Sequence, residues 1–498
     1  MNIQNAKTQI ANTLRAYLAK DETGNYRIPP MRQRPVFLIG PPGIGKTQIM
    51  EQIASEEGVG LVAYTITHHT RQSAVGLPFI EKRMFDGREY TVTEYTMSEI
   101  LTSVHMLMEK TGIREGILFL DEINCVSETL APMMLQFLQY KTFGNQRLPE
   151  GWLIVAAGNP PEYNRSVRDF DVVTLDRMKV IPVEEDYGVW KDYALRRNIH
   201  GAILSYLDLK RDNFYRMETS ADGPQFVTAR GWEDLSDLIR TYEKLGISVD
   251  ADVTMQYIRL PEIARDFANY LSLYRKYHEI YHVEELLSGR WPAIAESQFR
   301  SAAFDERLSV IGLLSSALSE KAGAVHRQDD ITACLHENLQ AWKASLGSSS
   351  PGEELDKLLS SLRQALNRAK EAGQGTSKRD KPQRAAIIAL EALRESLRDT
   401  LTPQQALDAA RQMLARESEK TDSLAEDCSR TFENAFRFLE HAVGDSQEMV
   451  LFVTNLTAGP DTSWFVENFG CESYFRHNKE LLADETRRSI LRDIANAT

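Results

Sequence analysis

Eight consecutive residues, Gly40 to Thr47, combine glycines with a lysine and a hydroxyl in the pattern G-x-x-x-x-G-K-[ST]. They follow the apolar run Val36–Ile39 and precede the helix-like stretch Gln48–Glu57. In such a unit the backbone N–H groups curl around phosphates, and the positive end of the helix adds to the attraction. Lys46 supplies a charge for the β- and γ-phosphates, and the Thr47 hydroxyl suits Mg²⁺. The predicted triphosphate loop consists of Gly40, Pro41, Pro42, Gly43, Ile44, Gly45, Lys46, Thr47 and Gln48.

Two adjacent carboxylates, Asp121 and Glu122, follow the apolar run Ile117–Leu120. In open α/β sheets ligands bind at the carboxyl ends of the strands, so a buried strand here would bring both acids to the edge that carries the phosphate loop. Asp121 is then the predicted metal partner, through a water molecule, and Glu122 the predicted group that polarises the attacking water. Two surface acids would need no such partner, but the upstream loop favours the catalytic interpretation.

Asn159 follows a similar apolar run, Leu153–Ala157, within Gly158-Asn159-Pro160-Pro161. Its amide is suited to hydrogen-bond the attacking water or the γ-phosphate. An asparagine that opens a proline-rich turn would look the same, so both interpretations stay open.

The elements that must position these residues alternate between short apolar runs and helical stretches, which is typical of a parallel sheet covered by helices on both faces. An amphipathic helix with Ile10, Leu14 and Leu18 precedes the first run. The predicted fold class is α/β: a three-layer, parallel-sheet P-loop NTPase core, a helical lid domain and a mostly helical C-terminal module. The apolar runs are Val36–Ile39, Leu61–Ile66, Ile117–Leu120, Leu153–Ala157 and Lys179–Val183.

Two insertions interrupt the predicted sheet. Phe79–Phe85 and Arg88–Tyr95 flank Asp86-Gly87, a dipeptide that tolerates the positive φ angles of a two-residue hairpin turn. Phe143–Pro149 allows a second, shorter hairpin, for which an ordinary surface loop is an equal alternative.

Three domains are predicted: a nucleotide-binding core over 1–183, a helical lid over 184–292 and an accessory interaction module over 293–498. Strand signals fade after Glu184, where helical periodicity takes over. The accessory module is predicted as helices broken by flexible segments at 346–352 and 373–382, with one strand at Met449–Asn455.

The chain has 498 residues, and its 58 Lys and Arg against 71 Asp and Glu give a net charge of −13. This charge argues against broad attraction to nucleic acid or an anionic membrane, and the basic stretch 378–384 is short. The polar start and the lack of ~18 consecutive apolar residues predict a cytoplasmic protein without a membrane segment. Four separated cysteines argue against a disulfide scaffold or a thiolate zinc site.

Together these motifs resemble the AAA+ ATPases, and their spacing is similar to that of the MoxR branch. The resemblance covers about residues 1–290 and includes the phosphate loop, Leu120-Asp121-Glu122-Ile123-Asn124, Gly158-Asn159-Pro160 and Leu175-Asp176-Arg177-Met178. It implies ATP and Mg²⁺ as cofactors, and it places Asn159 in the position of the polar sensor 1 residue.

By the same resemblance Arg177 corresponds to the arginine finger, which neutralises charge on the γ-phosphate from a neighbouring subunit. This sequence departs from the family pattern in two places, because Met178 replaces the usual phenylalanine and residues 168–173 replace a common Pro-Glu-Ala segment. Arg165 and Arg168 are rival fingers, and a salt bridge to a nearby acid is the structural alternative for Arg177.

Arg230, in Thr228-Ala229-Arg230-Gly231-Trp232, corresponds to the sensor 2 arginine, which would reach from the lid to the γ-phosphate. Ala229 replaces the proline that the family often has. A plain arginine at a helix N-terminus is the alternative interpretation.

The resemblance further implies a ring, expected to be hexameric, whose two hairpins face a protein client, and a partner with a von Willebrand factor A domain. This chaperone-like remodelling motor is the first functional hypothesis. An AAA+ motor that acts on DNA, as in restriction systems, and a nucleotide switch without motor activity are the alternatives.

Overall fold

In the computed structural model the chain folds as two compact units. Unit 1 is Met1–Asp186 with Ser360–Asp380, and unit 2 is Tyr187–Leu359 with Lys381–Thr498. The predicted division into three domains stays a prediction. The structure describes residues 1–68, 76–143, 146–163, 167, 170–220, 223–346, 350–372, 380–397 and 402–479.

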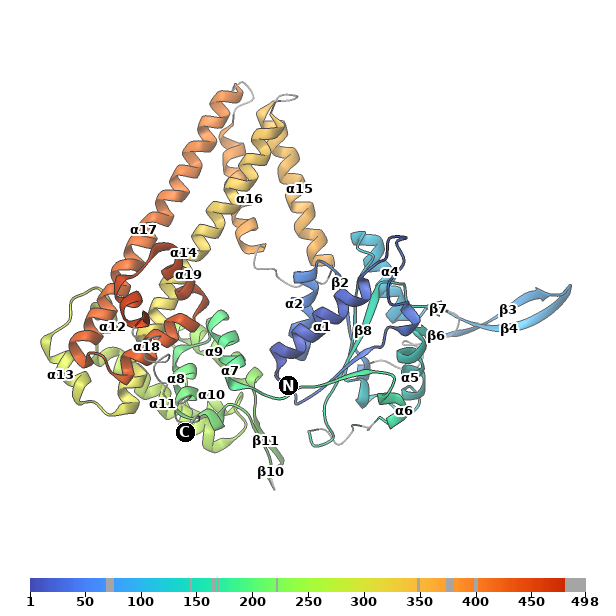
Figure 1. Cartoon of the computed structure of the whole chain (residues 1–498), viewed down its shortest axis with the longest axis horizontal. Helices are drawn as coiled ribbons and strands as arrows, with labels where there is room; N and C mark the ends of the chain where they lie inside the picture. Colours follow the sequence, from blue (N-terminus) through green and yellow to red (C-terminus); the bar gives the residue numbers. More distant parts are fainter. Residues whose placement is uncertain are drawn as a thin grey trace, which may run out of the picture. The chain divides into compact units, whose positions relative to one another are not determined.

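The centre of unit 1 is a five-stranded parallel sheet in the order β2-β5-β8-β1-β9 (Figure 1). All five strands coincide with the predicted apolar runs, and the α/β fold class is confirmed. The strands are β1 (Val36–Ile39), β2 (Gly60–Thr65), β5 (Gly116–Asp121), β8 (Trp152–Gly158) and β9 (Lys179–Pro182).

Helices cover both faces of this sheet. The N-terminal helix α1 (Ile3–Leu18) and α2 (Lys46–Glu57) bury their apolar residues against one face, in a cluster that includes Ile10 and Leu14. Helices α4 (Glu99–Thr111) and α5 (Ala131–Tyr140) pack against the other face. The short helix α6 (Val172–Leu175) precedes β9. This arrangement is the predicted three-layer core.

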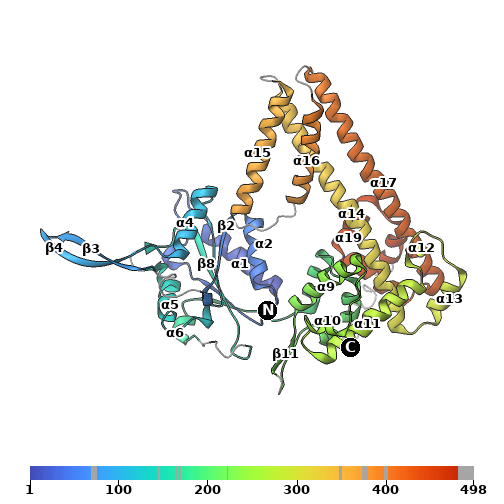
Figure 2. The ribbon, with the colours of Figure 1, turned by 180° about the vertical axis from the view of Figure 1, so that it is seen from behind.

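Both predicted hairpins are present in unit 1. Strands β3 (Pro78–Phe85) and β4 (Arg88–Tyr95) pair antiparallel, and in both views the hairpin projects away from the sheet (Figure 1 and Figure 2). Its turn places Asp86 at φ 50° and Gly87 at φ 75°, as expected for this dipeptide. The second hairpin joins β6 (Thr142–Phe143) to β7 (Gln146–Arg147), and its tip lies outside the described residues.

Unit 2 is mainly helical, with one two-stranded hairpin, β10 (Arg216–Ser220) and β11 (Gly223–Val227). One continuous buried core extends from Trp190 to Tyr474. Helix α15 (Pro351–Glu371) begins in unit 2 and ends in unit 1. The other helices of unit 2 are α7 (Tyr187–Arg196), α8 (Gly201–Leu209), α9 (Ala229–Leu245), α10 (Ala251–Met255), α11 (Pro261–Ile280), α12 (Val283–Leu287), α13 (Ala293–Ser301), α14 (Phe304–Ser345), α16 (Asp380–Ser396), α17 (Pro403–Val443), α18 (Gln447–Ala458) and α19 (Pro460–Phe469).

The predicted strand at Met449–Asn455 is wrong, because these residues belong to helix α18. Met449, Phe452, Val453 and Leu456 are buried on one stripe of that helix, a spacing of three to four residues. The β-branched residues of the segment favour a strand locally, but packing of the apolar stripe decides the outcome. Of the flexible segments predicted at 346–352 and 373–382, residues 347–349 and 373–379 lie outside the described residues. The prediction is wrong for their ends, because α15 begins at Pro351 and α16 at Asp380.

The expectation that no segment could cross a membrane needs a correction for α14. Among the described residues this one helix is long and apolar enough by composition, but half of its apolar window is buried inside the protein. Val310, Leu314 and Leu318 are fully buried in the core of unit 2, so the apolar character of α14 is explained by its place in that core.

Candidate active site

The phosphate loop connects the end of β1 to the start of α2. Gly43 and Gly45 adopt φ angles of 76° and 94°, in the left-handed region that favours glycine. A Cβ atom at Gly40 would lie 2.5 Å from the carbonyl oxygen of Val183, so only glycine fits where the loop leaves the sheet. Helix α2 begins at Lys46, and its N-terminus therefore lies at the loop, as anion binding requires.

Lys46 is held in the middle of this loop. Its ammonium group donates to the carbonyl oxygens of Gly40 at 2.7 Å and Pro41 at 2.8 Å, and to Asn159 Oδ1 at 2.9 Å. Only 7% of Lys46 is exposed. The structure thus brings Asn159, which follows β8, to Lys46 at the end of the loop that follows the neighbouring strand β1.

Thr47 and Asp121 form the second pair of the site. The Thr47 hydroxyl donates to Asp121 Oδ2 at 3.1 Å, and Asp121 is the last residue of β5. A hydroxyl and a carboxylate are hard oxygen ligands of the kind that Mg²⁺ takes in phosphate sites. These two side chains therefore fit the predicted metal, and other oxygen ligands would come from phosphate and water.

Glu122 follows Asp121 in a left-handed conformation, with φ 56°. Its backbone N–H donates to Asp121 Oδ1 at 2.9 Å, and its Oε2 accepts a hydrogen bond of 2.8 Å from the Thr67 hydroxyl. Thr67 lies just beyond β2, at the same edge of the sheet. Thr67 is not among the residues predicted from the sequence. The signal that could have found it is a hydroxyl just after a buried strand.

Asn124 is a second residue that the sequence analysis did not assign. It is 3% exposed, and its Nδ2 donates to the carbonyl oxygen of Asn159 at 2.8 Å. A Cβ atom at Gly158 would lie 2.4 Å from Asn124 Oδ1, so the glycine allows this close approach. Asn124 therefore holds the backbone of Asn159 and positions it relative to Lys46.

Cys125 is adjacent to the site but unsuited to act as a nucleophile. Burial, with smaller contributions from the charges of Glu122 and Asp121, raises the pKa of its thiol. The thiol therefore stays protonated near neutral pH, and a thiolate is the reactive form.

Arg177 lies in the turn between α6 and β9, and its side chain is exposed. No salt bridge joins it to an acid in the described part of the chain. Asp171 caps α6 by accepting a hydrogen bond from Thr174 N–H at 2.8 Å. Hydrogen bonds from Thr174, with a smaller contribution from the charge of Arg177, lower the pKa of this carboxyl. The rival arginines Arg165 and Arg168 lie outside the described residues.

Arg230 belongs to unit 2, where it is exposed in the first turn of α9. The preceding Thr228 caps this helix by accepting from Gly231 N–H at 3.2 Å. The two interpretations of Arg230 both place it at a helix start, and the sensor 2 role stays a prediction.

Comparison with protein families agrees with this geometry. Residues 35–178 match the model of the AAA domain, dynein-related subfamily. The match includes the phosphate loop, both carboxylates, Asn159 and Arg177. No curated protein matches the chain significantly. The chain thus contains a nucleotide-binding AAA ATPase domain, a class of nucleoside-triphosphate hydrolases.

Proposed function

We propose that this protein is an Mg²⁺-dependent ATPase of the MoxR-like branch, which works as a ring and uses hydrolysis to remodel or activate a protein client in the cytoplasm. The observation that carries the proposal is the set of contacts at one sheet edge. Lys46 with Asn159, Thr47 with Asp121, and Thr67 with Glu122 are each joined by a hydrogen bond there.

The roles of these residues follow from their positions. The loop N–H groups and Lys46 bind the phosphates, and Glu122 accepts a proton from the attacking water. Thr47 and Asp121 would hold Mg²⁺, which offsets the charge of the phosphate oxygens when it is bound. Asn159, held by Asn124, lies beside Lys46 and would orient the water or the γ-phosphate.

The ring is supported by Arg177. Its guanidinium is exposed and forms no salt bridge among the described residues, where Asp171 interacts with it only through its charge, so it is available to a neighbouring copy. An arginine supplied from another subunit stabilises charge on the transferred phosphoryl group. A hexamer, the typical ring of the family that the motifs resemble, is part of the proposal.

A protein client is supported by the hairpin β3–β4. Leu77, Phe79, Ile80, Met84 and Phe85 are each at least 45% exposed, and this apolar surface suits contact with a polypeptide. The partner with a von Willebrand factor A domain is proposed from the MoxR resemblance alone, with the predicted accessory module, residues 293–498, as the part that would receive it.

The first experiment measures ATP hydrolysis with Mg²⁺ and with EDTA over a range of protein concentrations. Specific activity is expected to require Mg²⁺ and to rise with concentration as rings form. Arg177→Ala should reduce the activity ~10³-fold or more while nucleotide binding persists. Activity that is independent of concentration and of Arg177 would rule out a finger supplied in trans.

The second experiment uses Glu122→Gln, which should bind ATP but hydrolyse it ~10²- to 10⁴-fold more slowly. Proteins captured by this variant with ATP would identify the client. Turnover at the wild-type rate would show that Glu122 is not the base. Binding to duplex or single-stranded DNA that weakens steeply with salt would instead favour the DNA motor. A nucleotide switch predicts binding without turnover in the wild-type protein.

A further inference from the structure

The hairpin β3–β4 of unit 1 is a separate sheet of two strands. It projects away from the five-stranded sheet (Figure 1 and Figure 2), and among the described residues β3 pairs with no strand other than β4. A two-stranded sheet exposes both of its edges, and each edge carries backbone N–H and C=O groups that can pair with another strand. Which of these groups are already used therefore decides what the hairpin can bind.

The hydrogen-bond pattern of this hairpin follows from its base. The Thr96 N–H donates to the carbonyl oxygen of Leu77 at 2.9 Å, so these two residues form a hydrogen-bonded pair. Bonded and non-bonded pairs alternate along antiparallel strands, and the register continues from this pair to Phe85 and Arg88 beside the turn. Every second residue of each strand therefore directs its backbone N–H and C=O outward. The outward residues are Ile80, Lys82 and Met84 in β3, and Glu89, Thr91 and Thr93 in β4.

The edge of β4 is partly covered at its base by the second hairpin. Gln146 of β7 donates from Nε2 to the carbonyl oxygen of Tyr95 at 3.3 Å. Tyr95 pairs with Pro78 at a non-bonded position, so this oxygen is one of the outward groups of β4. Gln146 Oε1 accepts from the Ser98 N–H at 3.3 Å. The side chain of Gln146 thus joins the β6–β7 hairpin to the β4 side of the longer hairpin.

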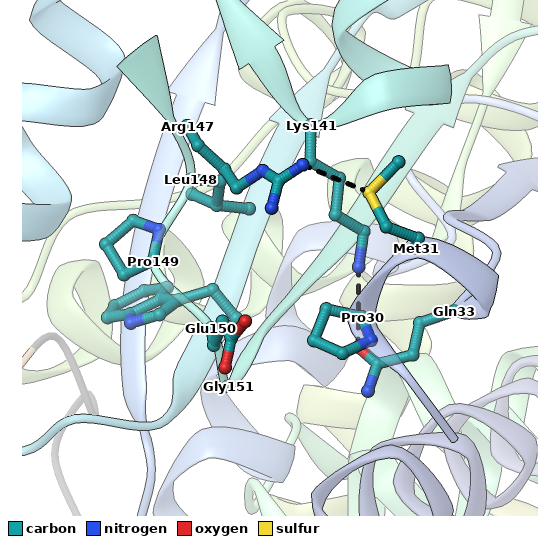
Figure 3. Close-up of a pocket in the computed structure, with 10 residues that line it drawn as sticks. Pro30, Met31, Gln33, Lys141, Arg147, Leu148, Pro149, Glu150 and Gly151 are labelled. Atoms are coloured by element: carbon teal, nitrogen blue, oxygen red, sulfur yellow. Dashed lines mark hydrogen bonds between the residues drawn. The ribbon is translucent and has the colours of Figure 1, made fainter. Parts of the chain in front are cut away.

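The second hairpin is itself fixed at its base. Arg147 donates to the sulfur of Met31 at 3.4 Å, and the Lys141 ammonium donates to Gln33 Oε1 at 3.4 Å (Figure 3). Both contacts hold this hairpin to the segment that precedes β1. Because the β6–β7 hairpin lies on the β4 side, the edge of β3 is the more accessible of the two.

The edge of β3 combines unpaired backbone groups with apolar side chains. Ile80 and Met84, 76% and 64% exposed, lie on either side of Lys82. A lysine on an edge strand discourages pairing, but the charge of Lys82 is already matched by Glu89 at 2.5 Å. Pro78 lacks an N–H and ends the edge at the base, and the turn ends it at the tip. The outward N–H and C=O groups between these limits have no partner among the described residues.

An extended polypeptide matches this edge in both spacing and chemistry. Outward groups on a strand recur about every 6.6 Å, because every second residue contributes them. Another extended backbone presents donors and acceptors at the same repeat, and a segment of about six residues spans this edge. In such strand addition the main-chain hydrogen bonds supply affinity, and side chains at alternate positions supply selectivity. Here the exposed side chains of Ile80 and Met84 favour apolar neighbours.

We propose that the edge of β3 binds an extended segment of the protein client, which pairs with β3 as a third strand and carries apolar side chains at alternate positions. This inference rests on the proposed function and names the class of client, a polypeptide with an unfolded or extended stretch. Three strands are more stable than two in water, so the bound segment would also stabilise the hairpin.

Residue-resolved hydrogen exchange with a synthetic probe tests the pairing. The probe is a ten-residue peptide in which valine alternates with threonine, with lysine at both ends, and it is added to the wild-type protein without nucleotide. The amides of Ile80, Lys82 and Met84 should exchange about tenfold more slowly, the effect of about one hydrogen bond's net free energy. The amides of Thr91 and Thr93 should not change. Protection of the β4 amides instead, or equal protection by a probe with N-methylated central amides, would overturn the proposal.

Three variants locate the binding edge. Lys82→Pro removes an outward N–H of β3, and Thr91→Pro removes the outward N–H directly opposite in β4. Proline is tolerated on edge strands where the N–H faces solvent. Fluorescence anisotropy of the labelled probe should show about tenfold weaker binding for Lys82→Pro, but wild-type binding for Thr91→Pro. Lys82→Ser keeps the backbone N–H and should also bind like wild type. A loss in either control equal to that in Lys82→Pro would refute pairing at the β3 edge.

A second copy of this hairpin is the other extended partner of the same chemistry. Protection of the β3 amides that needs no probe and grows with protein concentration would assign the edge to a neighbouring copy, which contradicts the proposal. Probe binding is measured without turnover, so it is independent of the ATPase experiments. A protein that hydrolyses ATP but does not bind the probe would keep the ATPase and reject strand addition, whereas binding without hydrolysis would do the reverse.

Discussion

At the scale of single residues, the geometry of Glu122 depends on its neighbours. A left-handed conformation is unfavourable for a residue with a Cβ atom, by ~1–2 kcal/mol. The hydrogen bonds from Glu122 N–H to Asp121 and from Thr67 to the Glu122 carboxylate compensate for part of this cost. Thr67 is thus a positioning residue, which acts on the reaction through Glu122.

Replacing Thr67 by valine keeps the shape of the side chain and removes the hydroxyl. We expect kcat for ATP hydrolysis to fall about tenfold, the loss of about one hydrogen bond's net free energy, with little change in KM. Thr67→Ser should restore most of the rate, since serine retains the donor. Steady-state kinetics of the two variants check this, and equal rates for valine and wild type would mean that the bond is incidental.

A second residue-scale prediction concerns stability and pH. Burial lowers the pKa of Lys141 from 10.5 to about 8. Below pH 8 the folded and unfolded chains both bind the proton, so the full cost of burying the charge is present. Between pH 8 and 10.5 the unfolded chain binds more protons than the folded one, and stability rises with pH.

Lys141→Met should therefore be more stable than wild type at pH 7, by up to ~3 kcal/mol, in chloride buffer. The advantage should shrink as the pH rises from 8 to 10.5. Denaturant unfolding at several pH values measures both, with Lys110→Met as the exposed control. A difference that does not change with pH would mean that this amine has the same pKa in the folded and the unfolded chain, so that burial does not shift it.

The place of some residues in the site can be predicted from the amino-acid sequence, and the place of others cannot. Lys46, Thr47, Asp121 and Glu122 occupy fixed offsets from apolar strands, so their meeting at one sheet edge follows from the parallel arrangement. Thr67 and Asn124 contact the site because of strand order and the close approach at Gly158. These contacts depend on which strands are neighbours in the sheet. The spacing of residues along the sequence does not specify that order.

At the scale of elements, the β3–β4 hairpin depends on contacts outside its own two strands. An isolated two-stranded hairpin is marginally stable in water, and every residue of β3 is exposed. Ile80 and Met84, 76% and 64% exposed, lie on one face because alternate residues of a strand share a face. This face is the part of the hairpin best suited to an apolar partner.

The double variant Ile80→Ser and Met84→Ser, made in the Glu122→Gln background, should capture at least several-fold less client with ATP. The matched control is Lys82→Ser with Glu89→Ser, which removes the Lys82–Glu89 ion pair of the same hairpin but leaves the apolar residues. Exposed ion pairs contribute little, so capture by the control should be unchanged. Quantitative mass spectrometry of the captured proteins compares them, and equal losses in both variants would point to hairpin folding rather than client contact.

In helix α18 the local sequence pattern favours a different type of element from the one observed. Its run of β-branched and aromatic residues from Met449 to Asn455 has strand propensity. Its buried residues nevertheless repeat every three to four positions against the core that contains α14. Helix or strand is decided here by the partner surface, which a single segment does not contain.

At the scale of the whole molecule, one helix belongs to both units. The segment after Ser360, which contains the second half of α15, is part of unit 1. The carbonyl oxygen of Ala372 accepts a hydrogen bond of 3.0 Å from the Leu61 N–H. Strand β2 is at the edge of the sheet, and this bond satisfies a backbone donor that an edge strand otherwise leaves unpaired.

The hydrogen bond between Leu61 and Ala372 is connected to the active site through strand β2. This strand runs from Leu61 toward Thr67, whose hydroxyl donates a hydrogen bond to the Glu122 carboxylate. The end of α15 therefore stabilises the strand whose far end positions the predicted base. The phosphate loop and the acids follow from motifs, whereas this link between residues 61 and 372 depends on tertiary structure alone.

Ala372 is fully buried. Ala372→Glu should break the hydrogen bond between Leu61 and residue 372, because burying a carboxylate there requires its costly desolvation. The Leu61 amide should then exchange its hydrogen at least tenfold faster, and kcat should fall several-fold as Thr67 loses its support. Ala365→Glu, at an exposed position of the same helix, is the matched control and should change neither. Hydrogen exchange with mass spectrometry of the β2 peptide, together with ATPase kinetics, measures both effects. Faster exchange with an unchanged kcat would show that the end of α15 protects the sheet edge without influencing catalysis.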